Sequence, residues 1–307
     1  MNYFDIQVNG YGGVDFNRDD LPAEDLHRAC ELLLADGVGG ILATIVTEAS
    51  EKMIQRIRRL VDLRSTDALA REMISGLHIE GPFISPVDGY RGAHPLDAIR
   101  PADESLAARM LEAGGGLVRI FTLAPEHDHG LRVTRMLADK GVVVSAGHTD
   151  ASLDELRAAI DAGVTMMTHL GNGCPLVQHR HDNIIQRALH LREHLWLSFI
   201  ADGVHVPYPA LRNYLDLAGE RALITTDAIA AAGLGPGTHQ INRWTVLVKE
   251  DLSTWAPDGS HLLGSAMGLP LVEKNLRNVL GLSDLQIKTL LCDRPRKAAG
   301  IAPNAVA

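Results

Sequence analysis

Eight short apolar runs alternate along the chain with stretches of helical periodicity, and this alternation restricts the fold more than any other feature of the sequence. The runs predict strands over residues 4–9, 40–47, 74–80, 117–123, 142–148, 165–169, 195–201 and 222–227. Strict alternation of strand and helix is typical of a parallel sheet. Eight such units within about 230 residues favour a closed (β/α)8 barrel over an open, doubly wound sheet.

Helices are predicted between the strands, and several are followed by a glycine, which often ends a helix. The predicted helices are 23–35, 51–63, 105–113, 131–140, 152–162 and 209–218. After residue 227 the pattern changes to a Gly-rich loop, a predicted hairpin over 241–255 and further helices from residue 266 onward. The sequence contains no linker, low-complexity tract or internal repeat, so we predict a single domain over residues 1–307.

Four residues able to bind a metal stand at the downstream ends of predicted strands. Glu80, His148, His169 and Asp227 end the third, fifth, sixth and eighth strands. The active site of a (β/α)8 barrel is built at the carboxyl-terminal ends of its strands, so we expect these four side chains to meet. Two imidazoles and two carboxylates gathered at one place indicate a hydrolytic metal site.

The residue types fit that chemistry. A carboxylate and two neutral imidazoles can hold a divalent ion with an open position, where bound water loses its proton near neutral pH. A further carboxylate beside that water can take and return a proton. Taken singly, each residue could instead be a buried polar group with structural hydrogen bonds. Their shared position at the ends of four strands favours the metal hydrolase.

Charge and composition exclude several other classes of protein. The 307 residues are 46% hydrophobic and carry a formal net charge of -9, with a pI near 5.8. A general nucleic-acid-binding protein needs a basic face to neutralise phosphates, which this balance argues against. Any anionic ligand must therefore be held by a few well-placed cations.

The cysteines and the apolar segments bear on the compartment. Cys30, Cys174 and Cys292 are odd in number and widely separated, which predicts a reducing environment without a disulfide framework. No apolar stretch is long enough to cross a bilayer, and residues 1–13 lack the regions of a signal peptide. We therefore expect a soluble cytoplasmic protein that binds neither membranes nor nucleic acids.

Seven segments carry a family resemblance. They read DIQVNG at 5–10, HIEGPF at 78–83, GAHP at 92–95, SAGHT at 145–149, THLGN at 168–172, ADGVHV at 201–206 and TDA at 226–228. In this order, and over nearly the whole chain, they resemble the N-acetylglucosamine-6-phosphate deacetylase family of the amidohydrolase superfamily. Each segment alone is a weak signal, whereas the ordered set is specific.

The resemblance implies a role for each residue of the proposed centre. Glu80, His148 and His169 match the ligands of a single catalytic metal, and Asp227 matches the general acid/base. His94 matches a histidine that helps to polarise the acetamide carbonyl. The ion is expected to be zinc, although iron and manganese accept the same mixed ligands.

The resemblance also implies a substrate side. Arg180 matches an arginine that binds the 6-phosphate, His205 a histidine that binds sugar hydroxyls, and the backbone at Asn172 and Gly173 a segment beside the phosphate. By sequence alone, Arg180 could be a solvated surface cation, and His205 and His94 could orient other groups. The further expected substrate contacts are Ala93, Leu262, Leu263 and Gly264.

Three departures qualify the resemblance. Many amidohydrolases place His-x-His on the first strand to hold a second metal, but this chain has Gln7 and Asn9 there, so one ion is expected. The family commonly carries a small β-sandwich, which we expect this sequence to lack. The loop after His169, with 171–175 and 179–183, differs from the family's usual residues around the phosphate.

These observations predict hydrolysis of the N-acetyl amide of N-acetylglucosamine 6-phosphate to acetate and the free amine. The alternatives are a related amidohydrolase that acts on another acylated or cyclic amide, and a catalytically silent barrel that only binds ligands. Relatives pair so that a phosphate-binding side chain reaches across from the neighbouring subunit, so a homodimer is expected.

Overall fold

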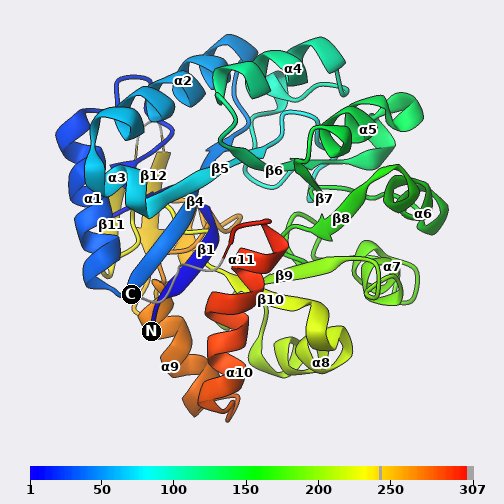
Figure 1. The fold of residues 1–307 in the computed structure, drawn as a ribbon. Coiled ribbons are helices and arrows are strands. Elements are labelled where there is room, and N and C mark those ends of the chain that lie inside the picture. The colour runs from blue at the N-terminus through cyan, green and yellow to red at the C-terminus, as the bar shows by residue number, and fades with distance from the viewer. Residues whose placement is uncertain (242–243, 303–307) are drawn as a thin grey trace.

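A computed structural model describes residues 1–241 and 244–302, and eight parallel strands stand at its centre (Figure 1). Hydrogen-bonded neighbours follow the order β1-β4-β5-β6-β7-β8-β9-β10. The strands are β1 (Tyr3–Val8), β4 (Val38–Val46), β5 (Ile74–Glu80), β6 (Val118–Leu123), β7 (Val143–Ala146), β8 (Val164–Met167), β9 (Trp196–Ile200) and β10 (Ala222–Thr225). All eight predicted strands are confirmed, and the fold is a (β/α)8 barrel.

Helices surround the strands, as the alternation predicted (Figure 1). The larger ones are α1 (Ala23–Ala35), α2 (Ser50–Thr66), α4 (Glu104–Ala113), α5 (Arg132–Asp139), α6 (Leu153–Ala162), α8 (Tyr208–Ala218) and α9 (Leu269–Asn278). The sequence analysis missed α3 (Ala68–Met73) and α7 (Ile184–His190) because each is too short to show a clear period. The chain continues after α9 with α10 (Asp284–Lys288), a π-helical turn (Thr289–Asp293) and α11 (Arg294–Ala298).

The closing seam of the barrel lies between β1 and β10, and a carboxylate bridges it. Asp5 of β1 is buried and accepts hydrogen bonds from the hydroxyls of Thr225 (2.5 Å) and Thr226 (2.6 Å). The backbone N–H of Thr226 and that of Gln7 also point to this carboxylate. Farther along, the Asn9 N–H donates to the carbonyl of Ala228 at 2.7 Å. Asp5 therefore supplies part of the polar pairing that a β-ladder supplies between the other strands.

The barrel interior has an apolar layer at its amino-terminal end. Side chains of β1, β4, β6, β8 and β10 meet there and pack against Ala298 and Ala299 at the end of α11. The layer consists of Phe4, Ile6, Leu42, Ile120, Met166 and Leu223. Burial of these side chains removes apolar surface from water and anchors the helix that covers this end.

A polar chain crosses the barrel above the apolar layer. His78 Nδ1 lies 2.9 Å from the carbonyl oxygen of Ile6, and Nε2 lies 2.7 Å from Thr122 Oγ1. Thr122 Oγ1 is 2.8 Å from Thr168 Oγ1, which is 2.6 Å from Ser145 Oγ. Burial lowers the pKa of His78 to about 4, so the ring is neutral and donates from Nδ1. The chain joins strands that carry the candidate ligands.

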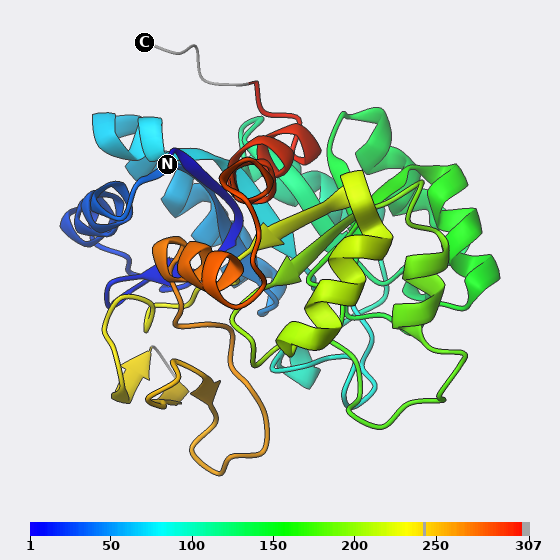
Figure 2. The same cartoon turned by 90° about the horizontal axis from the view of Figure 1, so that it is seen from below.

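A small antiparallel sheet lies outside the barrel, at the end opposite α11 (Figure 2). It consists of β11 (Gly237–Ile241), β12 (Trp244–Val248) and β13 (Thr254–Trp255). The predicted hairpin over 241–255 is therefore present but begins earlier, at Gly237. Residues 242–243 of that hairpin, and 303–307 of the predicted domain, lie outside the described residues. In the described part of the chain, no helix has the length and apolar character needed to span a membrane.

Candidate metal centre and active site

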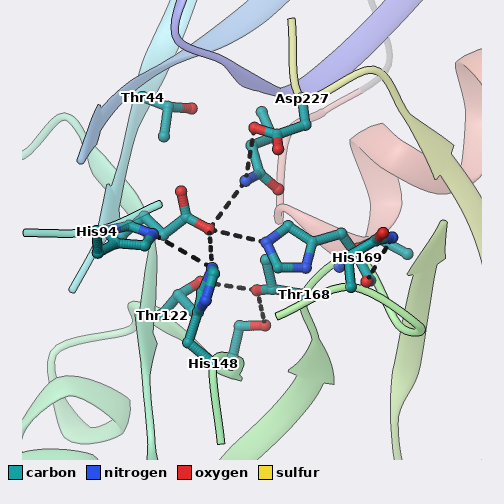
Figure 3. Close-up of polar contacts among 12 residues, drawn as sticks. Thr44, His94, Thr122, His148, Thr168, His169 and Asp227 are labelled. Carbon is teal, nitrogen blue, oxygen red and sulfur yellow. Dashed lines mark hydrogen bonds and ion pairs between the residues drawn. The ribbon is translucent and has the colours of Figure 1, made fainter. Parts of the chain in front are cut away.

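Glu80, His148 and His169 meet at the carboxyl-terminal ends of the strands. Figure 3 shows His148 and His169 side by side, with Asp227 nearby. Glu80 is the last residue of β5, and the two histidines stand two positions beyond β7 and β8. Glu80 Oε1 lies 3.2 Å from His148 Nε2 and 3.0 Å from His169 Nε2. One ligand atom from each of the three buried residues lies within 4.8 Å of the others, so together they could hold a metal ion.

The backbone turns sharply where these side chains enter the site. His148, His169 and Asp227 have φ angles of 52°, 32° and 52°, in the left-handed region that non-glycine residues seldom adopt. Each stands two residues after a strand, so the same local conformation recurs after β7, β8 and β10. Such strain persists where the surrounding structure fixes it, and it is concentrated at functional sites.

The ring of His148 is tightly confined. Its Nδ1 lies 2.8 Å from the carbonyl oxygen of Tyr90, so Nδ1 carries a proton, and Nε2 is the ring atom that faces Glu80. Gly173 has a φ of 58°, and a Cβ there would lie 2.8 Å from His148 Nδ1. Gly173, which the resemblance places beside the phosphate, thus packs against a candidate metal ligand, and a larger residue would displace the ring.

The donor set fits a divalent transition metal. Burial opposes the charge on Glu80, but hydrogen bonds from His148 and His169 hold the pKa of its carboxyl well below the usual range. The set therefore offers one ionised carboxylate oxygen and two imidazole nitrogens, as in three-ligand catalytic sites. These residues would leave a coordination position for water or substrate.

Asp227 lies beside this cluster and is held by two amides. Asn9 Nδ2 donates to Asp227 Oδ1 at 2.7 Å, and Gln7 Nε2 donates to the same oxygen and to Glu80 Oε1, both at 3.0 Å. Burial and the negative charge of Glu80 raise the pKa of Asp227 to about 6, against the influence of His169 and Asn9. A carboxyl with such a pKa is suited to exchange protons near neutral pH.

The sequence analysis missed this role of Gln7 and Asn9. It treated them as amides that bind transition metals poorly, whereas the structure makes them the donors that orient Asp227 and Glu80. Their carbonyl oxygens are buried and have no hydrogen-bond partner among the described residues. The sequence did carry a signal for this role, because Gln7 and Asn9 stand where many amidohydrolases have two histidines. An amide can donate to a carboxylate without adding charge.

His94 reaches the cluster from the loop after β5. Its Nε2 lies 3.3 Å from His148 Nε2, and the ring centroids are 4.4 Å apart (Figure 3). Burial and the neighbouring His148 lower the pKa of His94 to about 3, so this ring is neutral. It can offer one N–H to a ligand that enters the site.

The residues expected on the substrate side are less tightly grouped. Asn172 donates to the carbonyl of His169 at 3.2 Å, and His205 lies after β9 in contact with Asp202. Arg180 is exposed on the loop between β8 and α7 and has no hydrogen bond or ion pair with a described residue. Its guanidinium is therefore not drawn into the ligand cluster.

The segment 262–264 leads to a contact with the backbone of Asp227. The N–H of Ser265 donates to the carbonyl of Asp227 at 3.0 Å, and a Cβ on Gly264 would lie 3.0 Å from the same oxygen. Leu263 packs in the apolar cluster beneath the small sheet, together with Ala93. Leu262 forms an isolated antiparallel bridge with Trp255.

No family model matches the sequence. Among curated relatives, N-acetylglucosamine-6-phosphate deacetylase of Bacillus subtilis is 30% identical over 300 residues, covering 96% of this chain and 74% of the relative. The enzyme of that name from Bos taurus is 32% identical, covering 92% of this chain and 69% of the relative. The chain belongs to the N-acetylglucosamine-6-phosphate deacetylase family.

Solved structures of the family have the same fold. A deacetylase mutant from Mycobacterium smegmatis in complex with N-acetyl-D-glucosamine-6-phosphate gives a TM-score of 0.87 at 29% identity, covering 98% of this chain and 77% of that one. N-acetylglucosamine-6-phosphate deacetylase from Thermotoga maritima gives 0.83 at 29% identity, covering 97% and 78%. Membership of the N-acetylglucosamine-6-phosphate deacetylase family, inferred from seven short segments, is thereby confirmed.

Proposed function

We propose that this protein is a metal-dependent hydrolase that removes the acetyl group from N-acetylglucosamine 6-phosphate, giving glucosamine 6-phosphate and acetate. The observation that carries the proposal is the cluster of Glu80, His148 and His169 with Asp227 beside it, in a chain of a deacetylase family. The same set argues against a silent barrel, because a binding protein has no need of a strained, buried carboxylate and imidazole cluster.

Glu80, His148 and His169 would hold one divalent ion, for which we propose zinc. When bound, such an ion polarises a carbonyl and makes water acidic enough to attack near neutral pH. Zinc takes nitrogen and oxygen ligands and, in catalytic sites, keeps a position open beside three protein ligands. Gln7 and Asn9 are occupied with Asp227 and Glu80, which supports one ion rather than two.

Asp227 would accept the proton of the attacking water and later donate it to the departing amine. The amides of Gln7 and Asn9 fix its Oδ1, so the other oxygen remains to exchange the proton. His94 would donate its N–H to the acetamide oxygen as negative charge develops there. Each step uses a group within the buried cluster.

On the substrate side, we propose that Arg180 binds the 6-phosphate, because an unpaired guanidinium can grip phosphate with paired hydrogen bonds. His205 would bind a sugar hydroxyl, and Asn172 and Gly173 would lie beside the phosphate. Ala93, Leu262, Leu263 and Gly264 would form the adjoining wall. A homodimer, in which a phosphate-binding side chain reaches across from the neighbouring subunit, and a cytoplasmic location remain predictions, and light scattering at working concentration would test the dimer.

A second candidate substrate differs at one sugar hydroxyl. N-acetylgalactosamine-6-phosphate deacetylase of Escherichia coli is 28% identical over 299 residues and covers 97% of this chain. An acetate-release assay should therefore compare both phosphorylated sugars, the unphosphorylated sugar and other acylated amines. Preferential release from N-acetylglucosamine 6-phosphate, abolished by chelation and restored by a divalent ion, is expected. Preference for another amide would reject the proposed substrate.

A further inference from the structure

The turn after β9 forms a buried pair of a carboxylate and an imidazole. Asp202 Oδ2 lies 2.6 Å from His205 Nδ1, and both side chains are nearly inaccessible, at 2% and 6% exposure. Asp202 Oδ1 also accepts the backbone N–H groups of Val204 at 2.9 Å and His205 at 2.8 Å. The carboxylate thus holds both the backbone and the ring of His205.

Two further contacts leave this turn little freedom. Tyr208 donates its hydroxyl to the carbonyl of Asp202 at 3.1 Å. Gly203 has a φ of 81°, and a Cβ there would lie 2.4 Å from the ring of Tyr208, so only glycine fits between them. The pair is a rigid part of the carboxyl-terminal end of β9, and it lies between the loops that carry His169 and Asp227.

The protonation of the pair follows from its contacts. Burial opposes the charge on Asp202, but the hydrogen bond from His205 and those from two backbone N–H groups lower the pKa of this carboxyl. An ionised carboxylate only accepts hydrogen bonds, so His205 Nδ1 must carry the proton. In the neutral ring, Nε2 is then an acceptor, and it has no hydrogen bond to a described residue.

The position of His205 connects it with the chemistry. When protonated, its ring opposes the rise in the pKa of Asp227 that burial and Glu80 cause. The ring therefore lies within electrostatic reach of the proposed proton acceptor. A sugar hydroxyl that enters beside Asp227 would meet a ring nitrogen able to accept a hydrogen bond from it.

We propose that Asp202 is a positioning residue that fixes His205 as the Nδ1–H tautomer, so that Nε2 accepts a hydrogen bond from one ring hydroxyl of the substrate. The role of the hydroxyl rests on the proposed function, whereas the tautomer does not. A site built to accept from a hydroxyl strongly rejects an analogue that lacks it, because the buried acceptor then stays unpaired. Asp202 would thereby contribute to sugar selectivity without touching the sugar.

The test uses Asp202→Asn, which keeps the shape of the side chain. Two backbone N–H groups keep the amide oxygen on their side, so the NH2 replaces Oδ2 and donates to His205 Nδ1. The proton must then move to Nε2. Heteronuclear NMR of the imidazole nitrogens in protein loaded with a diamagnetic metal reads this directly, with Asp202→Glu as the charge-retaining variant. Asp216→Asn, at an exposed position of α8, is the matched control.

We expect Nδ1–H in the parent, in Asp202→Glu and in Asp216→Asn, and Nε2–H in Asp202→Asn. The value of kcat/KM for the natural sugar should fall about 10- to 100-fold in Asp202→Asn, with unchanged metal content. For a deoxy analogue that lacks the recognised hydroxyl, kcat/KM should differ little between the parent and Asp202→Asn. Retention of the proton on Nδ1 in Asp202→Asn, or equal losses for the sugar and every deoxy analogue, would overturn the proposal.

Failure of the proposed function gives a different result. A parent protein that releases no acetate from any acetylated amino sugar would contradict the deacetylase activity, and the NMR comparison would still decide the tautomer. If Asp202→Asn does not fold, Asp202→Glu and His205→Gln replace it. The amide oxygen of the glutamine in His205→Gln can accept a hydrogen bond from a hydroxyl, so this variant should still prefer the natural sugar over the deoxy analogue. Loss of that preference would overturn the proposal.

Discussion

The amide nitrogen of Asn9 lies 2.7 Å from Oδ1 of Asp227, so a neutral donor directly after the first barrel strand orients the carboxylate that follows the last barrel strand. This contact crosses the closing seam of the barrel, where Asp5 also bridges β1 and β10. The alignment of the proposed proton acceptor therefore depends on how the barrel closes. Substitutions at the site should change turnover, whereas a substitution at the seam should change the free energy of unfolding.

Asp227→Asn tests the proton acceptor. The amide keeps the shape of the side chain but cannot take a proton from water, so turnover should fall about a hundred- to ten-thousand-fold. Steady-state kinetics with metal content measured on the same samples gives the comparison. Turnover within a few-fold of the parent at unchanged metal content would assign the base to another residue, with His94 and His205 the first candidates.

The titration of Asp227 should respond to the metal. In metal-free protein, burial and Glu80 raise the pKa of its carboxyl to about 6, so the acid form prevails below that pH and the carboxylate above it. A bound cation stabilises the carboxylate, and loading should therefore lower this pKa. Carboxyl NMR, assigned with Asp227→Asn, measures both values. A rise on loading would contradict the placement of Asp227 beside the ion.

Metal analysis tests the ligand set. One tightly held ion per chain is expected, because one carboxylate and two imidazoles converge while Gln7 and Asn9 bond to carboxylates. His148→Ala together with His169→Ala should lose the ion. His94→Ala is the control: its ring touches His148 but is not in the cluster, so metal should remain. Elemental analysis that finds two ions in the parent would show that the set is incomplete.

Arg180→Ala tests phosphate recognition. If Arg180 binds phosphate through charge-assisted hydrogen bonds, transition-state stabilisation for the phosphorylated sugar should drop by roughly 2 to 4 kcal/mol. The unphosphorylated sugar should lose little. Arg132→Ala, which removes another exposed arginine, is the matched control. Equal changes in kcat/KM for both sugars would show that Arg180 does not bind the phosphate.

Asp5→Ala tests the seam. The substitution leaves the buried hydroxyls of Thr225 and Thr226 and the backbone N–H groups of Thr226 and Gln7 without this acceptor, so the free energy of unfolding should fall by about 2 to 4 kcal/mol. Urea unfolding followed by circular dichroism measures the change. Asp161→Ala, at an exposed position of α6, should have little effect. A loss as small as that of Asp161→Ala would show that Asp5 does not stabilise the barrel closure.

The sequence by itself determined the barrel and the position of the candidate ligands within it. Apolar runs and helical periods are local patterns, and the carboxyl ends of parallel strands meet at one end of a barrel, so Glu80, His148, His169 and Asp227 could be placed together from spacing alone. The family resemblance had the same origin, because its motifs are short and contiguous. Such information needs no knowledge of long-range contacts.

The tertiary structure decided what each polar group contacts. Gln7 and Asn9 are far from Asp227 in sequence, and only closure of the barrel makes them its donors. The packing of Gly173 against His148 likewise joins two separate loops. Sequence patterns report which face of an element is buried, but hydrogen-bond direction, pKa and ring orientation depend on atoms brought together across the whole chain.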